Sequence, residues 1–323
     1  MSELPSKPFH CISIVLPVYK TAIYLKELHK RLRDTLDNLK LDFELLMIDD
    51  GSPDNSWSII EQLAAEDSRV KGIRLSRNFG QHPAIAAGFE LAKGDAVVLM
   101  DTDLQDRPEE LPLLLEKLTD DIEVVYTVKK GEQPAWFTRM TSQLHHYVFS
   151  RLTQSRIPNN AGTYRVCTRR FLDAMLKFRE FNVLYGPLMY SMGFKHVLVE
   201  VQHDKRQGSK SSYTFAKRLK LGLNSLVSYT DIPHQLFMYF GSSILFLSFV
   251  YILIVLLEYW IWDIKLPAGM TMIVLLLAGM LGILTLSLGI IGIYIFRIYQ
   301  EVLARPRYLI AQQLNLSSNT KGV

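Results

Sequence analysis

Short apolar runs alternate with amphipathic stretches through the first half of the chain. The apolar runs lack polar alternation, which is typical of strands buried on both faces. They predict strands over 11–17, 43–49, 70–76, 95–101 and 122–128. Between them, apolar residues at three- and four-residue spacing predict helices over 23–39, 56–65, 83–91 and 109–118. A strand followed each time by a helix indicates an α/β fold with a mostly parallel sheet covered on both faces.

A polar cluster follows each of the first four predicted strands. The clusters read, in chain order, VYK, DDGSPDNS, SRNFGQH and DTDLQD. The carboxyl ends of parallel strands meet at one edge of a sheet, and ligands of open α/β sheets bind there. We therefore expect a single site built from these four turns.

Two long uncharged runs, 236–257 and 270–296, lie near the C-terminus. About 20 apolar residues in a helix cross a hydrocarbon core of ~30 Å, so we expect two transmembrane helices rather than a buried helical hairpin. Six basic residues and no acid lie within 205–220, and basic residues favour the cytoplasmic side. The sequence predicts a protein of the inner (cytoplasmic) membrane with both termini in the cytoplasm.

The predicted organisation has four segments. They are a cytoplasmic catalytic domain over 1–211, an amphipathic juxtamembrane helix over 212–233, the two membrane helices within 234–297, and a cytoplasmic tail over 298–323. The first residues have no apolar h-region, so no signal peptide is expected. Two cysteines, Cys11 and Cys167, are too few for a disulfide framework and are expected to be free thiols. The net charge is only +4, and no nucleic-acid partner is expected.

Asp101 and Asp103 follow a predicted buried strand. Neighbouring carboxylates repel each other and are stabilised by water or a cation. Mg²⁺ takes one or two carboxylates and fills its other positions with phosphate and water, so the pair indicates a divalent ion on a diphosphate. Gln105 is a candidate third oxygen ligand, whereas Asp106 is better placed to cap the next helix. The alternative is a solvated loop of helix-capping acids.

The second acidic turn, IDDGSPDNS, begins with Asp49 and Asp50. Capping the next helix needs one polar residue and not two adjacent acids, and a carboxylate here can accept hydrogen bonds from a base or a ribose. No G-x-G-x-x-G or Walker A sequence follows any strand, which disfavours a dehydrogenase and a P-loop ATPase.

Taken in order, SIVLPVYK, LLMIDDGSPDNS, RNFGQHPAIAAGF and DAVVLMDTDLQDRPEEL resemble family 2 glycosyltransferases with the GT-A fold. NAGTYRVCTRR, RQGSKSSYTFAKRLKLGLNSL and GIYIFRIYQEVLARPRY are similar to blocks of the polyprenyl-phosphate branch. That branch includes two-span bacterial undecaprenyl-phosphate sugar transferases and dolichyl-phosphate mannose synthases. The resemblance implies a GT-A Rossmann-like domain with a C-terminal two-helix transmembrane anchor.

The resemblance also implies an activity: inverting transfer of a sugar from a nucleotide-diphosphate sugar, with UDP favoured, to a polyprenyl phosphate such as undecaprenyl phosphate. The product would be a lipid-linked sugar for cell-envelope glycan modification, as in lipopolysaccharide. Asp103 would be the direct ligand of Mg²⁺ or Mn²⁺, with Asp101 and Gln105 beside it. The donor would be bound by Pro17, Tyr19, Asp50, Ser52, Arg77 and Asp101.

Arg165 matches a family arginine near the acceptor phosphate, which gives it a catalytic role with Asp101 and Asp103. A loop beside the site would add Arg206, Lys210, Ser211, Ser212 and Tyr213. Lys129 and Arg139 are further candidates for phosphate or headgroup contacts. Basic and hydroxyl side chains suit a phosphate, although the stretch could instead only attract anionic lipids.

One departure from the family concerns the catalytic base. Many relatives have an acid in the block where this chain has Asn160 and Thr163, and neither can abstract a proton usefully. A phosphate monoester has its second pKa near 6 and is largely dianionic at neutral pH. Our hypothesis is that the acceptor attacks without a protein base.

Other functions fit parts of the sequence. A transferase of the same fold with a saccharide or glycolipid acceptor is the main alternative, and a non-catalytic membrane scaffold is another. A processive polysaccharide synthase is disfavoured because Q-x-x-R-W is absent. Some two-span relatives form tetramers, so the resemblance allows a homo-oligomer.

Overall fold

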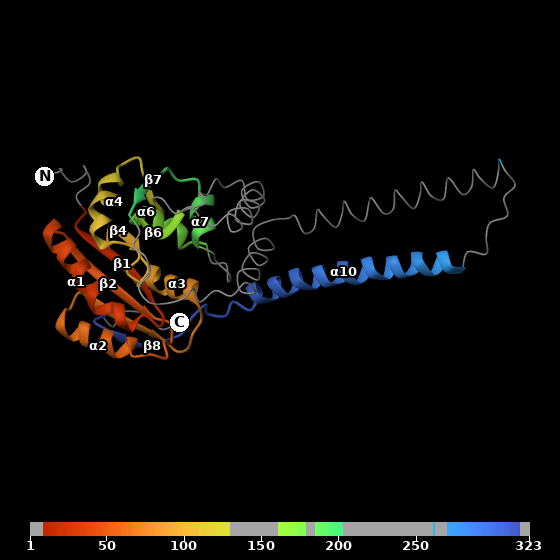
Figure 1. Ribbon diagram of the computed structural model, residues 1–323, viewed down its shortest axis with the longest axis horizontal. Coiled ribbons are helices and arrows are strands. Elements are labelled where there is room, and N and C mark those ends of the chain that lie inside the picture. The colour runs from red at the N-terminus through yellow and green to blue at the C-terminus, as the bar shows by residue number, and fades with distance from the viewer. Residues whose placement is uncertain (1–8, 130–160, 179–184, 203–260, 262–269, 317–323) are drawn as a thin grey trace. The chain divides into compact units, whose positions relative to one another are not determined.

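The computed structural model describes residues 9–129, 161–178, 185–202, 261 and 270–316 (Figure 1). The chain divides into two compact units. One joins Met1–Ser212 to Pro306–Val323, and the other is Tyr213–Arg305.

An eight-stranded sheet organises the first unit, with the strand order β7-β5-β6-β4-β1-β2-β3-β8. The strands are β1 (Cys11–Val18), β2 (Asp42–Asp49), β3 (Val70–Leu75), β4 (Ala96–Leu99), β5 (Val124–Lys129), β6 (Ala161–Thr168), β7 (His196–Val201) and β8 (Ile310–Leu314). The helices of this unit are α1 (Ala22–Leu39), α2 (Ser56–Glu66), α3 (Gln81–Leu91), the short 3-10 helix η1 (Pro108–Glu110), α4 (Leu111–Lys117), α6 (Arg169–Met175) and α7 (Tyr185–Ser191).

The four strands that carry the predicted site are all parallel. β1 pairs with β2 and with β4, and β2 pairs with β3, so their carboxyl ends share one edge of the sheet. Every strand and helix predicted in this half of the chain is present, and its bounds differ from the prediction by at most two residues. The predicted α/β fold with a mostly parallel sheet is confirmed.

Three strands were not predicted. β6 runs antiparallel between β4 and β5, β7 pairs with β5, and β8 runs antiparallel along β3. β8 comes from the segment predicted as a cytoplasmic tail. Its sequence, IAQQL, is short and half polar, as an edge strand with an exposed face can be, so it lacks the apolar run that revealed the inner strands.

Helices cover both faces of the sheet, as Figure 1 shows. Ile12, Ile14 and Leu16 of β1 pack in a core that includes side chains of α1, α2 and α4. Val15 lies in the core on the other face, with side chains of α3, α6 and α7. The alternation arises because successive strand residues point to opposite faces.

In the second unit, α10 (Met270–Val302) is one continuous helix that contains the whole of the predicted segment 270–296. Leu277, Leu284 and Leu288 are among its exposed apolar side chains. The predicted helices over 212–233 and 236–257 lie outside the described residues. Within the described parts of the chain, no helix meets the length and hydropathy expected of a membrane-crossing segment.

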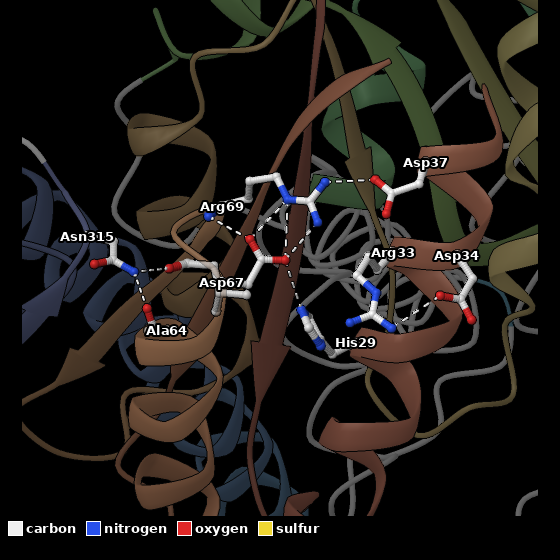
Figure 2. A network of polar contacts seen from close by, with 9 residues as sticks. His29, Arg33, Asp34, Asp37, Ala64, Asp67, Arg69 and Asn315 are labelled. Atoms are coloured by element: carbon white, nitrogen blue, oxygen red, sulfur yellow. Dashed lines mark hydrogen bonds and ion pairs between the residues drawn. The ribbon is translucent and has the colours of Figure 1, made fainter. Parts of the chain in front are cut away.

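A polar network around Arg69 joins α1 to the turn between α2 and β3 (Figure 2). Arg69 Nη1 donates to Asp37 of α1 at 2.7 Å. Nε and Nη2 each donate at 2.9 Å to Asp67, the residue that follows α2. Asn315, just after β8, donates to the carbonyl oxygens of Ala64 and Val70 at 2.7 and 2.9 Å. The C-terminal strand is thereby fixed to the same turn.

We predict that Asp67→Asn lowers the free energy of unfolding near pH 7 by about 1–3 kcal/mol, because it leaves a partly buried guanidinium with fewer charged partners. The hydrogen bond from Arg69 lowers the pKa of Asp67 from 3.8 to about 2. The unfolded chain is protonated first as the pH falls, so this stabilisation is complete above about pH 4 and disappears as the pH falls through the folded value.

Thermal unfolding of both proteins between pH 2 and pH 7 checks this. The difference between them should shrink toward pH 2. Asp34→Asn is the matched control. Within the described part of the chain the exposed Asp34 pairs with its neighbour Arg33 alone, at 3.4 Å, so it should matter little at any pH. Equal effects of the two substitutions would contradict the proposed role of the network.

Candidate active site

Thr102, which lies between Asp101 and Asp103, fixes the position of the acidic turn after β4. Thr102 is buried, its Oγ1 donates to the carbonyl oxygen of Pro17 at 3.2 Å, and it lies 2.9 Å from Oγ1 of Thr21. The next residue but one, Leu104, has φ of +60°, which is unusual for a side chain of this size. Strain of this kind persists where the surrounding structure imposes it, and here it fixes how Asp101 and Asp103 are presented.

Asp101 is held in an environment that disfavours its charge. Burial raises the pKa of Asp101 to about 6, and the nearby charges of Asp106 and Asp103 add to the rise. Two side chains oppose this: Gln81 Nε2 donates to Oδ1 at 3.0 Å, and the Thr163 hydroxyl also donates to the carboxylate. Carboxylates gathered in this way are suited to a cation, which would remove their repulsion.

The residues of this turn fit a divalent ion that is shared with a ligand. Asp103 Oδ1 accepts from the amide of Gln105 at 3.2 Å, which orders the turn. No group of three or more His, Cys, Asp or Glu side chains is arranged for a metal in the described residues. Mg²⁺ needs only one or two carboxylates when phosphate and water complete its shell, so Asp103 and Asp101 are enough for such a site.

The second acidic turn is fixed by both of its aspartates. The carboxylate of Asp50 accepts from the backbone amides of Phe79 and Gly80 at 2.7 and 2.9 Å, which joins the end of β2 to the turn after β3. Asp49 Oδ1 accepts from the Ser52 amide at 3.0 Å. Asp49 Oδ2 is buried with no hydrogen bond to the residues that the structure describes, and it lies 3.5 Å from Nε of Arg74. Burial raises the pKa of both Asp49 and Asp50.

A cavity of about 460 Å³ opens beside this turn. Its size is within the usual range for small-molecule sites. Ser52 and Arg77, two of the predicted donor-binding residues, line it, whereas Pro17, Tyr19 and Asp50 do not. Tyr19 is 43% exposed at the end of β1. Among the described residues, the lining consists of Gly51, Ser52, Arg74, Leu75, Ser76, Arg77, Ala311 and Gln312.

Arg165 lies on β6, opposite Leu99 of β4, two residues before Asp101. Its Nε and Nη2 donate to the carbonyl oxygens of Thr163 and Gly162 at 2.9 and 3.3 Å, and Nη1 lies 3.5 Å from the sulfur of Met189. Among the described residues no acid forms an ion pair with it. Burial lowers the pKa of Arg165, so this guanidinium is desolvated and still has capacity for an anion.

Two polar side chains at this edge were not predicted from the sequence. Gln81 supports Asp101, as described above. His82 is half-buried, and its Nδ1 is buried with no hydrogen bond to the described residues. Burial and then the charge of Arg165 lower the pKa of His82 to about 4, so the ring is neutral at pH 7. Both lie in SRNFGQH, one of the four polar clusters expected at this edge, but neither residue was singled out there.

Asp101, Asp103 and Gln105 lie in the turn after β4, and the carbonyl of Pro17 on β1 accepts a hydrogen bond from Thr102 of that turn. Ser52 and Arg77 line the cavity. Arg165 lies on the neighbouring strand β6. Lys129 is the last residue of β5. The remaining predicted residues lie outside the described part of the chain: Arg139, Asn160, Arg206, Lys210, Ser211, Ser212 and Tyr213.

We predict that Gly51→Ala disrupts this edge. Gly51 has φ of +60°, and a Cβ there would lie 2.7 Å from the carbonyl carbon of Arg77 and 2.8 Å from the amide nitrogen of Asn78. Gly193→Ala is the matched control, because Gly193 also has positive φ, +73°, but its Cβ would meet nothing within 4 Å. The control should lose about 1 kcal/mol of stability, and Gly51→Ala clearly more. Thermal unfolding measures both, and equal losses would contradict the close approach.

Comparison with known proteins identifies the family of the chain. Residues 13–176 match the family model for glycosyl transferase family 2. The uncharacterized glycosyltransferase YkcC of Bacillus subtilis is 36% identical over 311 residues, covering 95% of each chain. A mannosyltransferase of Pyrobaculum calidifontis, solved with GDP-Man and Mn²⁺, gives a TM-score of 0.45 at 16% identity and covers 65% of this chain and 60% of its own.

Glucosyl-3-phosphoglycerate synthase of Mycobacterium tuberculosis, solved with Mg²⁺ and UDP, gives a TM-score of 0.48 at 16% identity, covering 68% of this chain and 79% of its own. The match to the family model and the identity with the Bacillus relative show that the chain belongs to glycosyltransferase family 2 and is a glycosyltransferase.

Proposed function

We propose that this enzyme transfers a sugar, with inversion, from a nucleotide-diphosphate sugar, preferably UDP-linked, to a polyprenyl phosphate such as undecaprenyl phosphate. The observation that carries the proposal is Arg165. It is a half-buried guanidinium that forms no ion pair with an acid among the described residues, on the strand beside the acidic turn. The product is a lipid-linked sugar that a later transferase could use to modify a cell-envelope glycan.

Arg165 suits an anion better than a neutral hydroxyl. The charge of Asp101 acts on Arg165 from the neighbouring turn, and an arriving phosphate would add an opposite charge in direct contact and accept bidentate hydrogen bonds. The carbonyl oxygens of Thr163 and Gly162 orient the guanidinium. A saccharide acceptor has no charge to satisfy Arg165, which is why we favour the lipid phosphate over this alternative.

On the donor side, Asp103 and Asp101, with Gln105, would hold Mg²⁺ or Mn²⁺ on the diphosphate. Such an ion neutralises the charge that develops on the leaving nucleoside diphosphate. Gln81 and Thr163 orient Asp101 by hydrogen bonds, and Thr102 keeps the two aspartates at the strand end.

No protein base is needed in this proposal. The Thr163 hydroxyl is engaged with Asp101, and a phosphate dianion carries its own nucleophilic oxygen. That oxygen forms a bond to the anomeric carbon as the bond from this carbon to the diphosphate breaks, and the electron pair leaves with the diphosphate. Arg165 holds the acceptor phosphate and partly offsets the repulsion between the two anions.

We also propose attachment to the inner membrane through 236–257 and 270–296, with the catalytic unit on the cytoplasmic side. Both runs are uncharged, and the basic stretch 205–220 precedes the first of them. A polyprenyl phosphate exposes its phosphate at such a surface. A homo-oligomer is inferred from the resemblance alone.

Incubating the purified full-length protein with undecaprenyl phosphate, Mg²⁺ or Mn²⁺ and a panel of UDP- and GDP-sugars tests the reaction. We expect a lipid-linked sugar from one donor and none from Asp103→Ala. Transfer only to saccharides would favour the alternative acceptor. No lipid product from any donor would contradict the proposal, and product from Asp103→Ala would contradict the metal site.

Replacing Arg165 tests the acceptor site. We predict that Arg165→Ala raises KM for the lipid phosphate about 10- to 100-fold, the equivalent of a lost charged hydrogen bond, and changes KM for the donor little. Arg165→Lys should recover part of the loss, because lysine keeps the charge without the planar fork. Arg170→Ala is the matched control, since Arg170 is 78% exposed and pairs with Glu123 at 3.1 Å. An Arg165 effect confined to the donor would disprove the assignment.

A further inference from the structure

The C-terminal strand β8 supplies one wall of the cavity beside the β2 turn. Gln312 is paired with Arg74 across the β8–β3 ladder, and both side chains line the cavity. Arg74 Nη1 donates to Gln312 Oε1 at 3.4 Å. β8 is held in place on one side by the hydrogen bond from the Ser76 amide to the Leu309 carbonyl, 2.8 Å, and beyond its end by Asn315.

The cavity presents mainly hydrogen-bond donors. Arg77 has its guanidinium 4.2 Å from the ring of Phe79 and forms no ion pair with an acid in the described residues. Gln312 Oε1 accepts from Arg74, and Nε2 of the same amide donates and has no hydrogen-bond partner among the described residues, so it can donate to a ligand. Ser52 adds a hydroxyl. A ligand that fits this lining carries acceptor oxygens.

The position of the cavity relative to the acidic turn indicates which part of the donor it holds. Strands in a sheet lie about 4.8 Å apart. The order β4-β1-β2-β3 puts the ends of β2 and β3 two and three strands from the end of β4, so roughly 10–15 Å from it. With the diphosphate at the β4 turn, the nucleoside is the part of the donor that extends this far along the sheet edge.

We propose that Gln312 is a specificity-determining residue that reads the nucleobase of the donor, and that it selects a base with a carbonyl oxygen at the recognised edge, uracil or guanine, over cytosine or adenine. This inference rests on the proposed donor. It gives the C-terminal strand a part in substrate recognition, although its sequence lies more than 200 residues from the β3 turn that it faces.

Binding of UDP, GDP, CDP and ADP to the full-length protein with Mg²⁺ tests this. The wild type should prefer UDP or GDP. Gln312→Ala should reduce that preference roughly three- to tenfold, the effect of one neutral hydrogen bond. Gln312→Glu, which replaces the donor group by an acceptor and keeps the contact with Arg74, should shift the preference toward CDP, whose amino group donates at the same edge.

Gln313→Ala is the matched control. Gln313 is the next residue of the same strand, is also exposed, and does not line the cavity, so binding should stay within about twofold of the wild type. A loss of base selectivity would indicate lost recognition. Damage to the fold would instead weaken the binding of all four nucleotides to the same extent.

Three results would overturn the inference: no base preference in the wild type, equal effects of Gln312→Ala and Gln313→Ala, or an equal loss of inorganic pyrophosphate binding in Gln312→Ala. Failure of the wild type to bind any nucleoside diphosphate would instead contradict the proposed function itself.

Discussion

The parallel pairing of β1 with β2 and β4, and of β2 with β3, is the constraint on which the site depends. It brings four turns to one edge although they are spread over about 90 residues of sequence. Hydrogen bonds between turns then fix their spacing: Thr102 reaches the end of β1, and Asp50 joins the end of β2 to the turn after β3. A shift of one strand by one residue would invert its faces and separate these contacts.

The charged side chains at this edge of the sheet form three regions, and each favours a different kind of ligand. Asp101 and Asp103 form a region that favours a cation, while Arg165 on β6 favours an anion. Arg74 and Arg77 at the β3 end favour acceptor oxygens in the cavity. A nucleotide sugar, a divalent ion and a phosphate acceptor together would complement the charge of all three regions.

The sequence was informative where burial on both faces forces an unbroken apolar run, so the inner strands and the helices between them were predicted closely. The sequence did not reveal elements whose side chains are only partly buried. β8 has two glutamines in five residues, and only its pairing with β3 shows that it belongs to the sheet. Asp103, Ser52 and Arg165 could be proposed from motifs, whereas Thr102, Gln81, His82 and Gln312 could not. Their surroundings are made by contacts between distant segments, such as the hydrogen bond from Gln81 to Asp101.

In our proposal one sheet edge holds the whole donor, with its diphosphate at the β4 turn and its base toward β3 and β8. A structure of the full-length protein with a UDP-sugar and Mn²⁺, in which anomalous scattering locates the ion, would test this most directly. We expect the ion bound by Asp103 and the base in the cavity lined by Ser52 and Gln312. An ion away from Asp103, or a base bound away from this cavity, would contradict it.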